Sequence, residues 1–464
     1  MTPSTAPRVA VVGGGIAGLA AAHAVRTARP DVHVVVLEAS AALGGKLRGS
    51  EVAGVVVDEG ADSLLARVPD AVELARAVGL GDRLVPPATA GAGLWTRGRV
   101  RPLPTGTVLG VPADLRALAR SGALPPADVA RAALDLVLPG QPVEEDVAVG
   151  ALVARRLGRG VVDRLVDPLL GGVYAGRADA LSLHATVPQL ARTAATTPSL
   201  VRAARAARPA RPVEGPVFLG LVGGLGTLPP AVAAASGAEV RLGTTVRGLS
   251  RTPSGWRLEL GSAASPEALD ADAVVLAVPA APAARLLRGV APAAAAEVGV
   301  LDYASVALVT LVLDGPAPGT GSGYLVPAVE GRLTKAVTFT SRKWQHLAGG
   351  PAVVRASVGR VGEEASLQRD DADLVATVVR ELERAVGPLP HVLGTRVTRW
   401  GGGLPQYAVG HLDRVRRARA ALPPGLALAG AAVDGVGVPA CAGSGRRAGE
   451  AVLAHVRPAG AGAE

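Results

Sequence analysis

At 464 residues the chain is long enough for about three domains, and because aromatic residues make up only 2% of it, Val, Leu and Ala must fill the core. The formal net charge is +9, and arginine supplies almost all of the positive charge. No basic run is interleaved with aromatic side chains and no zinc-ligand spacing occurs, which argues against nucleic acid and metal as partners. The first residues lack a signal peptide and no run of about 18 apolar residues occurs, so we expect a cytoplasmic protein without a transmembrane helix.

The first predicted elements are an apolar strand over 9–12, a glycine turn and an alanine-rich helix. Gly13, Gly15 and Gly18 match the G-x-G-x-x-G pattern, in which the glycines allow a sharp turn, a close diphosphate and tight helix packing. A second strand over 32–38 ends at Glu38, where a carboxylate can accept hydrogen bonds from ribose hydroxyls. The turn therefore predicts a site for the adenosine diphosphate part of NAD or FAD.

Helical periodicity dominates the next part of the chain. A second glycine turn at 44–45 and a strand-like stretch lead to residues 112–170, whose apolar spacing predicts helices. The basic, proline-broken stretch 202–215 is interpreted as a solvated helix end and linker rather than a membrane-contacting surface.

Strand patterns return in the second half, over 238–251, 255–260, 271–279, 306–314, 335–341 and 352–359, and a helix follows at 371–387. The final segment is again an apolar strand, a glycine-rich loop and an apolar helix, which would return the C-terminus to the N-terminal nucleotide domain. A nucleotide fold that is interrupted and completed at the end suits a long cofactor. Together with short glycine loops at 44–45, 60 and 435–437, this favours FAD over NAD.

Four later stretches carry a family resemblance: 167–190, 323–348, 399–415 and 435–452. With the N-terminal glycines, they resemble the flavin-dependent amine oxidase superfamily and, within it, the porphyrinogen oxidases of haem biosynthesis. The resemblance implies an α/β fold, in which a Rossmann-like FAD-binding domain is interrupted by a helical subdomain and a mixed α+β substrate domain. The expected divisions are FAD-binding parts at 1–90, 213–285 and 399–464, a mostly helical part at 91–212 that faces the substrate or a membrane, and the mixed α+β substrate domain at 286–398.

The same resemblance implies the cofactor contacts. Those to the nucleotide are Gly13, Gly14, Gly15, Ile16, Ala17, Gly18, Glu38, Ala39 and Lys46. Gly60, Ala61, Asp62 and Ser63 are expected near the flavin ring, and Val246 against the adenine. Trp400, Val436, Gly437 and Val438 are expected to line the flavin from the C-terminal side.

The implied reaction is the O2-dependent oxidation of coproporphyrinogen III to coproporphyrin III, with hydrogen peroxide as the second product. Protoporphyrinogen IX is the alternative substrate, and an amine oxidase or carotenoid desaturase is a more remote alternative. Such chemistry depends on the flavin, and no side chain is assigned a catalytic role. His411 and Cys441 are interpreted as structural.

The substrate's propionates call for cationic partners. The candidates are Arg101, Arg177, Lys335, Arg342 and Lys343. Transient contact with the next haem-pathway enzyme and peripheral contact with a membrane are also expected from the resemblance.

Overall fold

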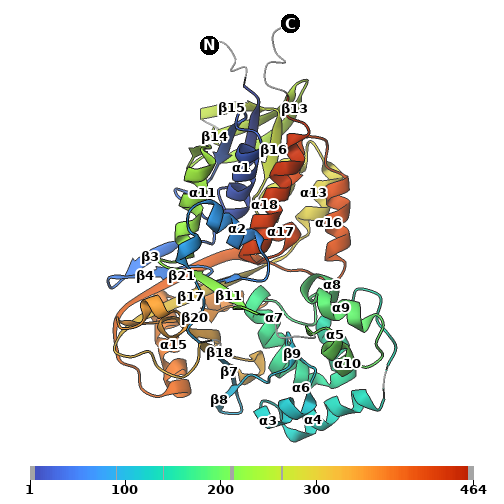
Figure 1. Cartoon of the computed structure of the whole chain (residues 1–464), viewed down its shortest axis with the longest axis vertical. Coiled ribbons are helices and arrows are strands. Elements are labelled where there is room, and N and C mark those ends of the chain that lie inside the picture. The colour runs from blue at the N-terminus through green and yellow to red at the C-terminus, as the bar shows by residue number, and fades with distance from the viewer. Residues whose placement is uncertain (1–5, 90, 139, 210–213, 263–264, 458–464) are drawn as a thin grey trace.

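The computed structural model describes residues 6–89, 91–138, 140–209, 214–262 and 265–457. A parallel sheet of five strands, in the order β12-β2-β1-β16-β22, forms the centre of one half of the molecule (Figure 1). Its strands are β1 (Arg8–Val12), β2 (His33–Leu37), β12 (Glu239–Arg241), β16 (Ala273–Leu276) and β22 (Leu426–Leu428). The predicted return of the C-terminal segment to the N-terminal fold is confirmed, as is the α/β fold class.

Both faces of this sheet are covered, which explains why its strands are almost continuously apolar. On one face lie α1 (Ile16–Ala28), α11 (Leu228–Ser236) and α18 (Val438–Leu453), with α2 (Asp70–Ala77) beside them. The other face packs against the antiparallel strands β13 (Val246–Thr252), β14 (Gly255–Ser262) and β15 (Ser265–Ala271) and against α12 (Ala280–Leu287), α13 (Pro292–Gly299) and α16 (His411–Ala420).

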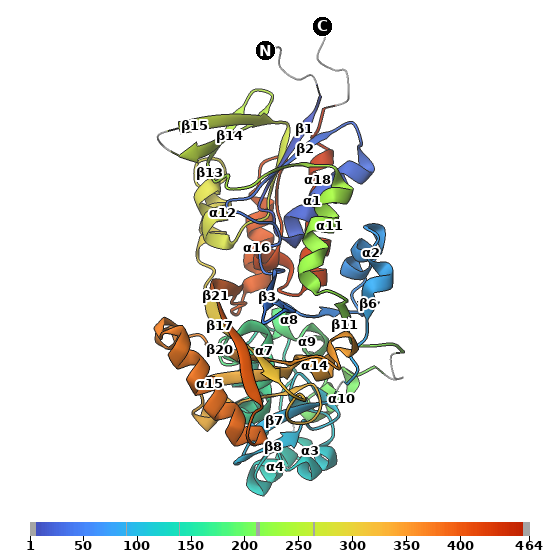
Figure 2. The same cartoon turned by 90° about the vertical axis from the view of Figure 1, so that its left-hand side faces the viewer.

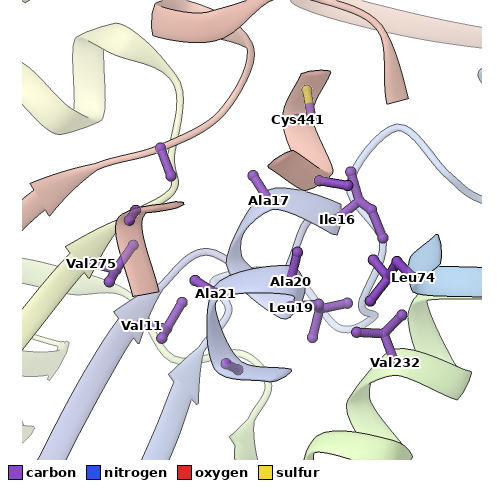
Figure 3. Packing of buried hydrophobic residues seen from close by; sticks show 14 of the residues in the cluster. Val11, Ile16, Ala17, Leu19, Ala20, Ala21, Leu74, Val232, Val275 and Cys441 are labelled. Atoms are coloured by element: carbon purple, nitrogen blue, oxygen red, sulfur yellow. The ribbon is translucent and has the colours of Figure 1, made fainter. Parts of the chain in front are cut away.

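The first and last long helices cross at unusually short range. A Cβ atom at Gly445 of α18 would lie 1.9 Å from the backbone oxygen of Ala17, and one at Gly449 would lie 2.7 Å from that of Ala21. Figure 3 shows the small side chains of α1 at the centre of this core, between Val11 and Val275 of the sheet and Leu74 and Val232 of α2 and α11. The absence of side chains at the two glycines therefore sets the distance between α1 and α18.

The other half contains a mixed sheet of seven strands in the order β21-β17-β20-β19-β18-β7-β8, in which only β18 and β7 pair in parallel. Its strands are β7 (Ala92–Thr96), β8 (Arg99–Pro102), β17 (Tyr303–Asp314), β18 (Gly323–Leu325), β19 (Thr334–Phe339), β20 (Ala352–Val358) and β21 (His391–Pro405). The helix α15 (Asp371–Val386) covers one face, and the hairpin β3 (Gly49–Val52) and β4 (Val55–Asp58) packs on the other (Figure 2).

Short helices form the third part, around a core of their own. They are α3 (Leu115–Ser121), α4 (Pro126–Ala133), α5 (Val149–Leu157), α6 (Arg159–Val161), α7 (Asp167–Tyr174), α8 (Leu183–Thr186), α9 (Pro188–Ala194) and α10 (Leu200–Ala206). A π-helical turn over Val162–Val166 joins α6 to α7. Among the described residues, no helix is both long and apolar enough to cross a membrane.

The remaining elements are short connections. The strands β5 (Leu64–Leu65), β11 (Phe218–Leu221) and β6 (Leu84–Val85) form a small antiparallel sheet, and β9 (Thr107–Val108) pairs with β10 (Val111–Pro112). The helices α14 (Thr340–Lys343) and α17 (Ala431–Asp434) are single turns.

The structure divides the chain differently from the sequence at three places. The segment 91–212, expected to be mostly helical, begins with β7 and β8 of the seven-stranded sheet. The helix α13, expected in the substrate domain, packs against the parallel sheet, and β21 runs across the expected division at 398. These elements are short or, in β21, interrupted by Gly401–Gly403, so their apolar pattern is weak.

We expect Gly445→Ala to destabilise the protein, because its Cβ would meet the Ala17 backbone oxygen rather than a flexible side chain. Overpacking of this kind lowers the free energy of unfolding by about 1–3 kcal/mol. Urea denaturation would measure the change. The matched control is Gly289→Ala, at an exposed glycine where an added Cβ would have no atom within 4 Å, and there the change should stay within about 0.5 kcal/mol. Equal effects of both substitutions would contradict this account of the crossing.

Candidate active site

The glycine turn before α1 has the shape that its pattern predicts. Gly13 has φ +109°, and a Cβ atom there would lie 2.6 Å from the backbone oxygen of Ala277. A Cβ atom at Gly18 would lie 1.9 Å from the oxygen of Gly13, so α1 can pack this close only without a side chain. In front of Gly15, at the N-terminus of α1, no atom lies within 4 Å of the Cβ position. The helix N-terminus thus faces open space of the kind that accommodates a diphosphate.

Glu38 lies where the turn and the second strand meet. Its Oε2 accepts a hydrogen bond from the backbone N–H of Gly14 at 2.6 Å, and its Oε1 accepts from the N–H and hydroxyl of Ser40. Ala39 beside it is exposed, and the Glu38 carbonyl accepts from Thr244, two residues before the buried Val246. This fixed carboxylate is placed to accept hydrogen bonds from a ribose, so the residues present fit an adenine dinucleotide.

Two further glycine segments pack against this turn. Gly44 donates a backbone hydrogen bond to Gly14 at 2.9 Å. A Cβ atom at Gly60 would lie only 1.8 Å from the backbone oxygen of Lys46, and Ala61 donates to that same oxygen. Burial lowers the pKa of the Lys46 ammonium. The segments 13–18, 44–46 and 60–61 therefore form one continuous backbone surface.

An ion cluster connects the following residues to the seven-stranded sheet. The Lys343 ammonium lies 3.1 Å from Asp62 Oδ1 and donates to the hydroxyl of Ser63, while Arg355 Nη1 lies 3.5 Å from Asp62 Oδ2. Arg355 also donates to the backbone oxygen of Gly60. Burial opposes ionisation of Asp62, but the charges of Lys343 and Arg355 outweigh it and hold the pKa of Asp62 at about 2.

A second carboxyl group beside this cluster behaves in the opposite way. Burial raises the pKa of Asp58 to about 6, with Asp62 adding to the increase and Arg355 opposing it. Its Oδ1 accepts a hydrogen bond from Gly226. The site thus holds one carboxylate that is firmly ionised and one that titrates close to neutrality.

The C-terminal segment closes the site. The Trp400 indole donates to the backbone oxygen of Glu59 at 2.7 Å, and Val436 packs against the hydrophobic cluster of the helical part. Gly437 caps α18, and Val438 begins it. Cys441 is buried one turn later, where burial raises the pKa of its thiol to about 11, so it is a neutral core residue as expected. Trp400 thus contacts the residue before Gly60, and Val438 lies in the same core cluster as Ile16 and Ala17.

The candidate substrate cations fall into separate places. Lys335 and Arg177 approach the same group, formed with Arg360 and Glu363 between β19 and the end of α7. Arg177 and Arg360 each lie 3.1 Å from a Glu363 oxygen. Lys335 is 6% exposed and makes no ion pair among the described residues, and burial lowers its pKa to about 7, with Arg360 adding to this and Glu363 opposing it.

The other three candidates do not join this group. Lys343 belongs to the Asp62 cluster, and Arg342 is exposed and donates to the backbone oxygen of Ala317. Arg101 lies on β8, at the edge of the sheet, beside Gly122. The structure thus brings together two of the five cations that the sequence suggested.

Sequence reasoning missed Arg355 and Arg360, which are 8% and 6% exposed. A signal was present for Arg355, since it is the one charged residue within the apolar strand β20. Arg360 follows the same strand and donates to the backbone oxygen of Val326 at 3.1 Å.

Comparison with known proteins agrees with this geometry. The family model for flavin containing amine oxidoreductases matches residues 16–453. The coproporphyrinogen III oxidase of Mycobacterium leprae (strain TN) is 38% identical over 450 residues, covering 96% of this chain and 98% of the relative. That of Bacillus subtilis (strain 168) is 32% identical over 461 residues, covering 95% and 96%.

Solved structures agree as well. One from Exiguobacterium sp. 255-15 has a TM-score of 0.86 and 34% identity, and covers 96% of this chain and 98% of its own. Cyclohexylamine oxidase from Brevibacterium oxydans IH-35A, at 17% identity and TM-score 0.73 over 97% and 99% of the chains, shows the same fold.

The fold and site define an FAD-dependent oxidoreductase. The chain belongs to the flavin containing amine oxidoreductase family and, within it, to the family of the coproporphyrinogen III oxidases. The predictions of FAD as cofactor and of an oxidoreductase are confirmed.

We expect Asp58→Asn to change stability in a pH-dependent way. Because the pKa of Asp58 is raised to about 6 from an ordinary 3.8, its contribution to stability is full below that lower value and is lost as the pH rises through about 6. An Asn side chain stays neutral, so the Tm of the variant should rise relative to the wild type between about pH 4 and about pH 7. Thermal unfolding across this range is the measurement, with the exposed Asp302→Asn as control. A Tm difference that is constant with pH would contradict the assignment.

Proposed function

We propose that this chain oxidises coproporphyrinogen III to coproporphyrin III with O2, releasing three molecules of hydrogen peroxide for each macrocycle. The observation that carries the proposal is the similarity over nearly the whole chain, at 38% identity, to enzymes of that name. The open space in front of Gly15, at the N-terminus of α1, also supports a bound diphosphate.

When bound, FAD would supply the redox chemistry, the transfer of two electrons at a time from the substrate to O2. The chain's own residues would bind and orient the cofactor and the substrate. The N-terminus of α1 would hold the diphosphate and Glu38 the ribose, while Lys343 and Arg355 fix the segment 60–63 through Asp62.

The macrocycle requires a broad surface next to that segment. Ser357 lies opposite Leu308 and Ala336 in the sheet register, and Thr338 lies opposite Arg355, so all five residues share one face. Leu308, Ala336, Thr338 and Ser357 are small or apolar and half-buried on this otherwise interior face. This inner face, with Arg355 reaching from it to Gly60, is the surface on which we place the substrate.

The cations beside the inner face support an anionic substrate. Lys335 and Arg360 are both buried, and the nearby Glu363 carboxylate is already shared by Arg360 and Arg177. A buried ammonium without its own counterion favours an incoming carboxylate such as a propionate. Coproporphyrinogen III has four propionates and protoporphyrinogen IX has two, so an excess of buried cations favours the former.

An amine oxidase is the second candidate, because solved amine oxidases share the fold. An amine substrate would enter as a cation and would be repelled by the Lys335–Arg360 pair. Contact with a membrane surface and with the next haem-pathway enzyme remains part of the proposal, as does O2 as oxidant.

The direct test mixes the purified FAD-containing protein with coproporphyrinogen III without oxygen. We expect the flavin absorbance to bleach, and the porphyrin Soret band to grow fully once air is admitted. Protoporphyrinogen IX and a primary amine are the comparison substrates. Bleaching by the amine and not by either porphyrinogen would overturn the proposal.

Substitution of Lys335 tests the propionate site. Lys335→Met should raise the KM for coproporphyrinogen III about tenfold, which corresponds to about 1.4 kcal/mol, with little change in kcat. The matched control is Arg342→Met, which removes an exposed cation of the same segment.

The same site predicts a pH dependence. Because the pKa of Lys335 is lowered to about 7, its charge is lost as the pH rises through that value, so the wild-type KM should increase there. Lys335→Arg keeps its charge and should remove this increase. Steady-state kinetics between about pH 6 and about pH 8 would measure both effects, and an identical profile for Lys335→Arg and the wild type would contradict the role of Lys335.

A further inference from the structure

A cavity of about 310 Å³ lies where the helical part meets the C-terminal segment. Tyr174 at the end of α7 and Ala185 on α8 line it from the helical part, and residues of α16 and α17 line it from the other side. The exposed Leu412 and Arg416 lie at its outer end. Its volume is at the low end of the ~300–1,000 Å³ typical of small-molecule pockets, so a tetrapyrrole with four propionate arms does not fit.

The inner end of the cavity adjoins the loop that is predicted to line the flavin. Gly435 lines it, and the following residue, Val436, packs against the hydrophobic cluster that includes Tyr174 and Tyr407. The two tyrosine rings, 5.4 Å apart, also line the cavity. Leu325 packs on that cluster as well, and it lies beside Ala336 of the inner face. The cavity and the substrate surface thus both adjoin the hydrophobic cluster on which Val436 packs.

The wall of the cavity is electrically balanced. The His411 ring stacks on Tyr407 at 4.1 Å, and burial, with Arg414 adding to it, lowers the pKa of His411 to about 4, so that the imidazole is neutral. The Tyr407 hydroxyl donates to the backbone oxygen of Ala431. The arginines of the wall are paired with carboxylates, Arg416 with Asp413 and Arg419 with Asp434. Such a wall suits a small neutral molecule and gives no advantage to a propionate.

We propose that this cavity is the path by which O2 reaches the flavin and hydrogen peroxide leaves it. The inference rests on the proposed function, in which one macrocycle is oxidised three times. A macrocycle bound on the inner face would block the access of O2 to the flavin from that side during all three oxidations. O2 therefore needs a second route to the flavin. Beside these polar groups, Val415 and Val433 add apolar surface to the wall, and apolar surface of this kind takes up small uncharged molecules such as xenon.

The reaction balances with neutral molecules alone passing through the cavity. In each round the substrate loses a hydride from a bridging carbon and a proton from a pyrrole nitrogen. These two electrons and two protons convert one O2 to one H2O2, and a C=C or C=N bond forms in the macrocycle. Neither O2 nor H2O2 carries a charge, which agrees with a cavity wall whose arginines are paired with carboxylates.

Ala185→Trp would test this path, because Ala185 lines the cavity and is only partly buried, so that an indole there would narrow the cavity. The FAD-containing protein is reduced with dithionite and then mixed with O2 in a stopped-flow instrument. We expect the second-order rate of reoxidation to fall about tenfold, equivalent to about 1.4 kcal/mol on the barrier. Reduction by coproporphyrinogen III without oxygen should keep its wild-type rate.

Leu412→Trp, at the exposed outer end, provides a second variant should Ala185→Trp fail to fold, and Ala420→Trp is the matched control on an exposed position of α16 outside the cavity. Wild-type crystals under xenon pressure should show xenon in the cavity, a result independent of turnover. Wild-type reoxidation rates in both cavity variants, or an empty cavity under xenon, would overturn the inference. The reoxidation experiment uses dithionite and not a porphyrinogen as the reductant. If the protein does not react with porphyrinogens, the proposed function is refuted, but the role of the cavity in reoxidation is still tested.

Discussion

The close crossing of α1 and α18 is the constraint on which the rest of the structure depends. Gly445 and Gly449 let α18 approach the backbone oxygens of Ala17 and Ala21, so the last helix is held against the first. Each helix begins at a loop of the proposed cofactor site: α1 at the glycine turn that ends with Gly15, and α18 at Gly437. The distance between these loops is therefore set by glycine packing in the core, away from any ligand.

The two halves of the molecule are joined by charge rather than by apolar packing alone. Arg355, on the seven-stranded sheet, reaches Gly60 and Asp62, and Lys343 reaches Asp62 from the same half. Such buried pairs add little net stability, because desolvation offsets their attraction, but they hold a single geometry. Here that geometry places the inner face of the sheet next to the segment 60–63. The neighbouring Asp58 forms no ion pair within the described part of the chain, and its ionised form is less stable.

The sequence could predict those parts in which each residue's role is local. The strand β1, the glycine turn and α1 form one unbroken pattern, and the helical spacing of apolar residues in α15 likewise specifies its helix. The strand β21 could not be predicted, because it lies at a sheet edge with many exposed positions and contains Gly401–Gly403. The family resemblance supplied the cofactor segments, whose roles as ligands stay predictions, but the contacts between them had to come from the structure.

The charged residues show the same limit more sharply. Lys335 and Arg342 lie seven positions apart in one segment, and the sequence gives no reason to distinguish them. In the structure, Lys335 is buried without an ion pair among the described residues, whereas Arg342 is exposed. The difference arises from the packing of α7 against β19, which no local pattern encodes. Arg355 is unusual in its strand, but its partner Asp62 lies in a distant part of the chain.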